Sequence, residues 1–324
     1  MNHTMPRFEN KLNLLITGGA GFIGSHFTEL ITKEEMYNIT VIDSLTYAGN
    51  LRNLQNINHL ISFKRIDIRN SLEIEKLFID GKFDIVINFA AESHVDNSIS
   101  NPYIFLETNI LGTQVLVDAS IKYGGARFIQ ISTDEVYGSI KEGYFDEDAR
   151  FNPSSPYSAS KASAEHLITS ARKTFGLRTN IVRCSNNYGT RQFPEKLIPL
   201  VISKALKGER IPVYGDGLNS REWLHVEDCA KAIKMVLESG ADGASYNISS
   251  GVELSNFEVV SKILELLEAK YELIEYVDDR RGHDFRYSIS SHKITSELGW
   301  KPAIGFTDGL QDTVNWYKQE YSND

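Results

Sequence analysis

TGGAGFIGS, residues 17–25, joins the apolar run LNLLITG at 12–18 to a helical stretch predicted over 22–35. Its glycines follow the spacing Gly-x-x-Gly-x-x-Gly, beginning at Gly18. Glycine allows a tight turn after a strand and a close approach of the backbone to a diphosphate, which the N–H groups at the start of the next helix attract. In this order of strand, turn and helix, the pattern predicts a dinucleotide-binding fold.

The first half of the chain repeats this alternation of short apolar runs and helical stretches. Further buried strands are predicted at 38–44, 61–67, 83–90, 127–133 and 178–184. Helices are predicted between them at 71–79, 104–122 and 157–175. Strands buried on both faces are typical of a parallel sheet, and right-handed crossovers make such a sheet doubly wound. The predicted fold class is therefore α/β, a doubly wound parallel sheet of the Rossmann type.

The second half has a different rhythm, with loops, short elements and helices predicted near 227–238 and 256–268. We expect residues 1–185 to form the dinucleotide-binding domain and residues from about 225–250 to return to its sheet. Residues 186–324 should form mainly a smaller, C-terminal substrate-binding portion.

Composition and charge favour small-molecule chemistry. The 324 residues are 41% hydrophobic and 24% charged, and the net charge of -9 argues against a surface for nucleic acid or an anionic membrane. The first residues, MNHTMPRFENK, lack the apolar core of a signal peptide, and no apolar run approaches the roughly 20 residues that span a bilayer. We therefore expect a cytoplasmic protein.

The cysteines and histidines offer little support for a metal site. Cys184 and Cys229 are the two cysteines, and we expect both to be packing residues with free thiols. The eight histidines show no ligand spacing typical of a metal, so no metal is predicted.

The second predicted strand ends at Asp43, about 20 residues after the glycines, where an acidic residue binds the adenosine ribose hydroxyls. Its carboxylate would repel a ribose 2′-phosphate, and no arginine follows until Arg52. The sequence therefore favours NAD over NADP as the cofactor.

YSASK places Tyr157 and Lys161 four residues apart, on one face of a predicted helix. A free tyrosine has a pKa of about 10, but a neighbouring ammonium and a positive nicotinamide ring favour its phenolate. Tyr157 could then accept a hydroxyl proton while the adjacent carbon gives a hydride to NAD.

STDEVYG, residues 132–138, places Asp134 and Glu135 directly after a predicted strand. Hydride transfer needs only one general base, so two adjacent carboxyl groups are either a solvated turn or the acid and base of a second reaction. Ligands bind at the carboxyl ends of parallel strands, and this position favours the second interpretation.

Together these motifs resemble the extended short-chain dehydrogenase/reductase family of NAD-dependent epimerases and dehydratases. The resemblance rests on the glycine turn, NFAAESHVD at 88–96, Ser-Thr at 132–133 and Tyr-x-x-x-Lys at 157–161. Within that family, several stretches are similar to the dTDP-glucose 4,6-dehydratases, in order along nearly the whole chain: STDEVYG, DSLTYAGNL (43–51), SNNYG (185–189), FPEKLIP (193–199), PVYGDG (212–217), REWLHVED (221–228) and RGHDFRY (281–287).

The resemblance implies a redox-neutral dehydration of dTDP-glucose to dTDP-4-keto-6-deoxyglucose. Tyr157 and Lys161 would serve oxidation at C4, with Thr133 hydrogen-bonded to O4. Glu135 would remove the proton at C5 and Asp134 would protonate the departing 6-hydroxyl, after which hydride returns to C6. Mutual repulsion can separate the pKa values of two adjacent carboxyls, which suits an acid and a base in one site.

The resemblance also implies two sets of binding residues. Those expected to bind NAD are Gly18, Gly21, Phe22, Ile23, Gly24, Asp43, Ser44, Thr46, Asp67, Ile68, Ala90, Ala91, Ser93, Thr108, Tyr157, Lys161 and Asn187. Those expected to bind the nucleotide sugar are His94, Thr133, Asn186, Lys196, Leu197, Pro212, Tyr214, Arg221, Asn256, Arg280 and His283. Two phosphates need Arg221 and a second cation, and a base needs an apolar slot against Tyr214. Arg221 could instead merely pair with Glu222.

The chain departs from the usual pattern of these dehydratases in its substrate portion. The departures are Thr190-Arg191-Gln192 for Pro-Tyr-His, Glu222 for Asp, Arg281 for Pro and Phe285 for Arg. They leave open a UDP-, GDP- or CDP-linked substrate.

Two other functions are possible for a chain of this fold, and the resemblance also implies an assembly. A nucleotide-sugar 4-epimerase needs no acid and base at C5 and C6, so Asp134 and Glu135 argue against it. A non-catalytic NAD sensor would not need Tyr157 and Lys161. Relatives dimerise by packing two helices into a four-helix bundle, so the resemblance implies a homodimer through 104–122 and 157–175.

Overall fold

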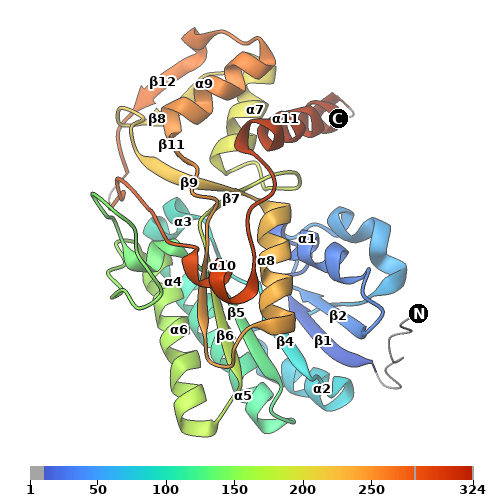
Figure 1. Cartoon of the computed structure of the whole chain (residues 1–324). Coiled ribbons are helices and arrows are strands. Elements are labelled where there is room, and N and C mark those ends of the chain that lie inside the picture. The colour runs from blue at the N-terminus through green and yellow to red at the C-terminus, as the bar shows by residue number, and fades with distance from the viewer. Residues whose placement is uncertain (1–10, 281, 323–324) are drawn as a thin grey trace, which may run out of the picture.

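The computed structural model describes residues 11–280 and 282–322. Within these residues the main sheet has seven parallel strands in the order β10-β6-β5-β4-β1-β2-β3 (Figure 1). The strands are β1 (Leu12–Thr17), β2 (Tyr37–Asp43), β3 (Ser62–Arg65), β4 (Ile85–Asn88), β5 (Arg127–Thr133), β6 (Thr179–Cys184) and β10 (Ser245–Ile248). The chain runs outward from β1 to β3, then returns to β4 and runs outward in the other direction, which confirms the predicted doubly wound α/β fold.

Helices cover both faces of this sheet. In β1, Leu14 and Ile16 face one hydrophobic cluster and Leu15 faces another, because successive side chains of a strand point to opposite faces. The first cluster is completed by α1 (Phe22–Ile31) and α8 (Val226–Ser239).

The second cluster is completed by α2 (Ser71–Gly81), α5 (Thr113–Lys122) and α6 (Pro156–Phe175). The predicted helix over 157–175 is thus confirmed to within one residue. Ser155 caps its N-terminus with a capping box, and Gly176 ends it in the left-handed conformation.

Two predicted helices differ from the structure. The stretch 104–122 is divided into α4 (Pro102–Phe105), a π-helical turn η2 (Leu106–Gly112) and α5. The helix predicted over 22–35 ends at Ile31, because the amides of Lys33 and Glu34 bond back only three residues and close a turn before β2. Neither difference moves a candidate site residue to another element.

The smaller portion contains two short sheets and its own hydrophobic core. One sheet consists of β11 (Glu253–Ser255), β9 (Ser220–His225) and β7 (Asn186–Tyr188), and the other of β12 (Ile274–Val277) and β8 (Ile211–Tyr214). The helices α7 (Leu197–Lys207), α9 (Asn256–Leu267) and α11 (Phe306–Ser322) bury Ile202, Val260 and Val314 against each other. Figure 1 shows these helices at one end of the molecule, away from α2 and α5.

The chain crosses more than once between the two portions. After β7 to β9 it returns to the main sheet with α8 and β10, and α10 (His292–Leu298) packs against both of these elements. The remaining helical elements are α3 (Val95–Ser100) and the 3-10 turns η1 (Leu51–Leu60), η3 (Asp134–Tyr137) and η4 (Tyr271–Leu273).

The cysteine prediction is confirmed: Cys184 and Cys229 are free and buried, with their sulfur atoms 3.4 Å apart. None of the described helices is long and apolar enough to cross a membrane. The N-terminal stretch considered for a signal peptide falls almost entirely on residues 1–10, outside the described residues.

Candidate active site

The glycine turn brings the ends of β1 and β4 into close contact. Gly18 has a φ of +67°, and a Cβ atom there would lie 2.6 Å from the backbone nitrogen of Ala90. A Cβ atom on Gly24 would lie 2.3 Å from the carbonyl oxygen of Gly18. Only glycine fits either position, so α1 begins directly against the turn, with its N-terminal N–H groups at the point where the strand order reverses.

Asp43 is fixed at the edge of this turn. Its Oδ2 accepts a hydrogen bond from the Ala20 amide at 3.0 Å, and its Oδ1 accepts one from the Leu45 amide at 2.8 Å. Burial raises the pKa of Asp43, and these two amides oppose the rise by favouring the carboxylate. The residues therefore fit a dinucleotide, with a diphosphate at the turn and ribose hydroxyls at Asp43.

One cavity extends over the carboxyl ends of β1, β2, β4, β5 and β6. All the residues predicted to bind NAD, from Gly18 to Asn187, line this cavity. The five predicted catalytic residues line it as well: Thr133, Asp134, Glu135, Tyr157 and Lys161. The topology thus brings together side chains from five separate strands.

The acidic pair is not a solvated turn. Thr133 accepts a hydrogen bond from the Glu135 amide at 3.2 Å and donates one to Asp134 Oδ1 at 3.2 Å, which fixes η3 at the end of β5. Asp134 is 2% exposed, and its Oδ2 has no hydrogen-bond partner among the described residues. A buried carboxyl oxygen without a partner is costly, and Asp134 lines the cavity, so this oxygen is available to a bound group.

The two carboxyls of the pair have different surroundings. Burial, followed by the charges of Glu135 and Glu222, raises the pKa of Asp134 well above its usual value. Burial also raises the pKa of Glu135, but the charges of Arg280, Arg221 and Lys196 oppose that rise. Asp134 is therefore the better proton donor near neutral pH and Glu135 the better base.

Tyr157 and Lys161 lie on α6 beside the acidic pair, and their surroundings differ from the prediction. Burial and the charge of Glu135 raise the pKa of Tyr157, while hydrogen bonding with Thr133 lowers it. Lys161 donates to the carbonyl oxygen of Ile131 at 2.6 Å, and burial lowers the pKa of its ammonium to about 8. The protein alone thus keeps the phenol neutral, and the ammonium is held by β5.

The predicted substrate residues fall into separate groups. Thr133, Asn186 and Lys196 line the cavity. Tyr214 and Arg280 meet at Asp96: the Tyr214 hydroxyl donates to Oδ2 at 3.2 Å, and Arg280 Nη1 lies 3.4 Å from Oδ1.

Two histidines complete this second group. His283 packs edge-on against the ring of Tyr214, with centroids 6.1 Å apart, and His94 lies 4.0 Å from Asp96. Leu197, Pro212 and Asn256 join neither group within the described residues: they lie at the start of α7, in β8 and at the start of α9. Arg221 is buried in β9 and is not one of the residues that line the cavity.

The sequence reasoning missed two acidic residues of the cavity wall. Glu92 and Glu195 both line it, and burial raises the pKa of Glu92. Glu195 Oε1 is buried without a hydrogen-bond partner among the described residues. Both residues lie inside the quoted motifs NFAAESHVD and FPEKLIP, so their place within these motifs was the available signal.

The departures at 190–192 are accommodated by contacts with the dinucleotide-binding half. Arg191 forms an ion pair with Glu29 of α1 at 2.5 Å, and His26 of α1 contacts the Thr190 carbonyl oxygen at 3.0 Å. Gln192 donates to the Asn187 carbonyl oxygen at 2.9 Å. The departure at Arg281 lies outside the described residues.

A family model described as GDP-mannose 4,6 dehydratase matches residues 15–313. The chain belongs to this dehydratase family. It is 49% identical over 310 residues to the low-salt glycan biosynthesis protein Agl12 of Haloferax volcanii, covering 94% of this chain and 98% of that protein. It is 47% identical over 334 residues to the dTDP-glucose 4,6-dehydratase of Salmonella typhimurium, covering 94% of this chain and 92% of that enzyme.

The fold of this dehydratase-family chain is also that of a solved relative. DesIV, a dTDP-glucose 4,6-dehydratase from Streptomyces venezuelae solved with NAD and TYD bound, matches with a TM-score of 0.93 and 43% sequence identity. The match covers 96% of this chain and 98% of that chain. The resemblance predicted from the motifs is therefore confirmed.

Replacing Asp134 with asparagine should stabilise the protein above the usual aspartate pKa of 3.8. Because the folded pKa is raised, the carboxyl contributes its full stability below the unfolded pKa, and that contribution is lost as the pH rises toward the folded pKa. The amide has no such dependence. We expect Asp134→Asn to raise the melting temperature by a few degrees at pH 8, with the difference shrinking toward pH 4.

Thermal unfolding followed by circular dichroism between pH 4 and pH 8 measures this difference. The exposed Asp80→Asn is the matched control and should shift the melting temperature little at any pH. A constant difference between the Asp134 variant and the unmodified protein across this range would contradict the raised pKa.

Proposed function

We propose that this chain is a dTDP-glucose 4,6-dehydratase that converts dTDP-glucose to dTDP-4-keto-6-deoxyglucose and water. The observation that carries the proposal is the Asp134–Glu135 pair, with Asp134 buried, beside Tyr157 in one cavity. A dehydrogenase or a 4-epimerase needs only the tyrosine and lysine, whereas loss of water across C5 and C6 needs a further base and a further acid. The activity named for the Salmonella and Streptomyces relatives supports the same conclusion.

NAD is the cofactor that these residues fit. The turn from Gly18 to Gly24 would hold its diphosphate at the start of α1, and Asp43 would bind the ribose and disfavour a 2′-phosphate. When bound, NAD supplies the site with an acceptor for the C4 hydride, a donor that returns it to C6, and a positive charge that favours the Tyr157 phenolate.

The first proton transfer belongs to Tyr157. Its phenolate accepts the proton of the 4-hydroxyl while C4 is oxidised, and Thr133, which hydrogen-bonds with Tyr157, orients the same oxygen. Lys161, with a pKa of about 8, is mostly charged at neutral pH and adds a positive charge on the same face of α6.

The second pair of transfers belongs to the acidic residues. The 4-ketone acidifies the C5 proton because the resulting carbanion is an enolate, and Glu135 removes that proton. Asp134, which keeps its proton because it is buried, gives it to the departing 6-hydroxyl, so that water leaves and a C5–C6 double bond forms. Return of hydride to C6 and of a proton to C5 completes the product.

The substrate portion would hold the nucleotide. The cations for a diphosphate would be Lys196, Arg221 and Arg280. The charges of all three lower the pKa of Glu135, against the effect of burial. Tyr214 and His283 supply ring surfaces for the base.

Incubation of the purified protein with NAD and dTDP-glucose tests the proposal. Mass spectrometry should show loss of one water from the nucleotide sugar, without accumulation of reduced cofactor, and NADP should support little turnover. UDP-, GDP- and CDP-glucose serve as the comparison panel. A product of unchanged mass with inverted C4 configuration, or reduced cofactor equal to product, would contradict the proposal.

Separate variants should divide the reaction into its two halves. Tyr157→Phe should abolish all steps, because no ketone forms to acidify C5. Asp134→Asn combined with Glu135→Gln should allow C4 oxidation but lower water loss by a factor of about 10² to 10⁴, since each group is a positioned acid or base. Single-turnover absorbance of the reduced nicotinamide beside mass-spectrometric product analysis measures both halves, and full dehydration by the double variant would exclude a role for the pair.

We also propose that the protein is a homodimer that packs through the predicted stretches 104–122, which the structure divides into α4, η2 and α5, and 157–175, which is α6. Tyr103 and Leu111 in this region are 73% and 59% exposed, large apolar side chains of the kind that a second copy would cover. Tyr103→Glu with Leu111→Glu should give monomers by light scattering. Leu72→Glu, at an equally exposed position of α2, is the control and should leave the dimer intact. A monomeric unmodified protein would refute the proposal.

A further inference from the structure

Residues 284–289 run alongside β9, although more than 60 residues separate them in the sequence. Ser220 and Arg286 form a parallel bridge, with the Ser220 amide bonded to the Phe285 carbonyl oxygen at 2.8 Å. Alternate side chains of paired extended segments point to opposite faces, so this pairing has two distinct faces.

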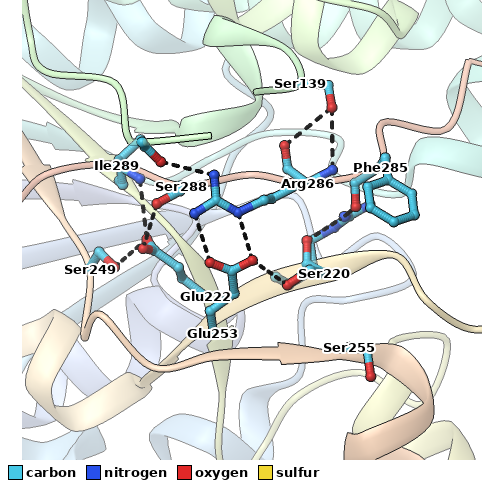
Figure 2. Close-up of polar contacts among 12 residues, drawn as sticks. Ser139, Ser220, Glu222, Ser249, Glu253, Ser255, Phe285, Arg286, Ser288 and Ile289 are labelled. Carbon is cyan, nitrogen blue, oxygen red and sulfur yellow. Dashed lines mark hydrogen bonds and ion pairs between the residues drawn. The ribbon is translucent and has the colours of Figure 1, made fainter. Parts of the chain in front are cut away.

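The face that contains Ser220 and Arg286 is clamped by charged groups. Figure 2 shows the Arg286 guanidinium against the Glu253 carboxylate, with Nε to Oε1 at 2.7 Å and Nη2 to Oε2 at 2.8 Å. Ser220 also donates to Glu253, at 2.6 Å, and Arg286 Nη1 donates to the Gly143 carbonyl oxygen at 2.8 Å. This bidentate pair holds the segment to β11 and to the loop before α6.

Glu222 belongs to the same clamp. Its buried carboxylate accepts hydrogen bonds from Ser249, from Ser288 at 2.9 Å and from the Ile289 amide at 3.3 Å (Figure 2). These partners occupy Glu222, and Arg221 points to the other face of β9. The alternative interpretation, in which Arg221 merely pairs with Glu222, is therefore wrong.

Arg221 and Tyr287 meet on that other face. The guanidinium carbon of Arg221, a residue that is 4% exposed, lies 4.3 Å from the centroid of the Tyr287 ring. The guanidinium donates to the carbonyl oxygens of Ser220 at 2.7 Å, Phe285 at 3.2 Å and Asp284 at 2.9 Å. These bonds use three of its five N–H donors, so Nε and one N–H of Nη2 remain as a fork that can bind an anion.

The ring of Tyr287 is itself fixed. Its hydroxyl donates to Asp284 Oδ2 at 2.7 Å, and the same carboxylate oxygen accepts a hydrogen bond from Ser154. Ser154 directly precedes Ser155, the N-cap of the helix that contains Tyr157. Asp284 thus connects the surroundings of Arg221 with the start of the catalytic helix.

We propose that Tyr287, held by Asp284, is a positioning residue that aims the Arg221 guanidinium at the substrate diphosphate. The proposal rests on the proposed function, in which Arg221 binds that diphosphate. The electron-rich ring face stabilises a buried cation and restricts its plane, and the three carbonyl oxygens fix its rotation. A positioned fork loses less freedom when it binds a phosphate than a mobile side chain does.

Calorimetric titration of the NAD-saturated protein with dTDP tests whether Tyr287 positions Arg221. Thymidine is the probe without phosphates, and its binding is measured by ligand-observed NMR. Tyr287→Leu should weaken dTDP binding about tenfold and thymidine binding less than twofold, because only the diphosphate contact is lost. Tyr287→Phe keeps the ring but loses the hydroxyl bond to Asp284, and should weaken dTDP binding by a smaller factor. Tyr276→Leu, at an exposed tyrosine of β12, is the matched control and should change neither affinity.

A double-mutant cycle shows whether Tyr287 acts through Arg221. In an Arg221→Ala background, Tyr287→Leu should cost less than a further twofold in dTDP affinity, because the group that it positions is gone. Full additivity of the two losses would overturn the proposal.

Other outcomes distinguish a failure of the Tyr287 proposal from a failure of the proposed function. If the unmodified protein binds dTDP and neither Tyr287 variant weakens that binding, the proposal for Tyr287 fails and the proposed function is unaffected. Equal weakening of dTDP and thymidine would also overturn the proposal for Tyr287, because the damage would then be general. If the unmodified protein does not bind dTDP, the proposed function fails, and the proposal for Tyr287 fails with it.

Discussion

The contact between Gly18 and the backbone of Ala90 is the constraint on which the site depends. Because no Cβ atom separates them, β1 and β4 end close together at the point where the strand order reverses. Chains leaving these two strands turn to opposite faces of the sheet, and a crevice opens between them. Asp43 and the acidic pair reach this crevice because parallel strands all end at the same edge.

A second constraint is electrostatic and joins the two portions of the molecule. Placing the carboxyl groups of Asp134 and Glu135 side by side away from water is unfavourable when both are charged. The neighbouring charges differ between the two carboxyls. The charges of Lys196, Arg221 and Arg280, all from the substrate portion, oppose the rise in the pKa of Glu135. For Asp134 the negative charges of Glu135 and Glu222 add to the rise, and only Arg221 of these three cations opposes it. The half that would bind substrate therefore also sets which carboxyl is the acid and which is the base.

Local rules explain how much of this arrangement the sequence could predict. The glycine turn and the helix after Pro156 have short local sequence patterns, Asp43 has a characteristic spacing from the glycines, and each was found where it was expected. The surroundings of Arg221 depend instead on carbonyl oxygens more than 60 residues distant, which no local pattern reveals. The phenol of Tyr157 shows the same limit: spacing predicted a helpful lysine, but burial and a carboxylate decide the direction of its pKa.

The departures from the family pattern can be understood in the same terms. Phe285 is 58% exposed, and that position contributes its carbonyl oxygen to Arg221 rather than its side chain. Glu222 is occupied by Ser249, Ser288 and a backbone amide, and Arg191 pairs with α1. None of these three substitutions removes a cation from the group around Glu135. They therefore leave in place the cations proposed to bind a diphosphate, and the choice among nucleotides would fall to the surfaces proposed to face the base, foremost the ring of Tyr214 and its neighbour His283.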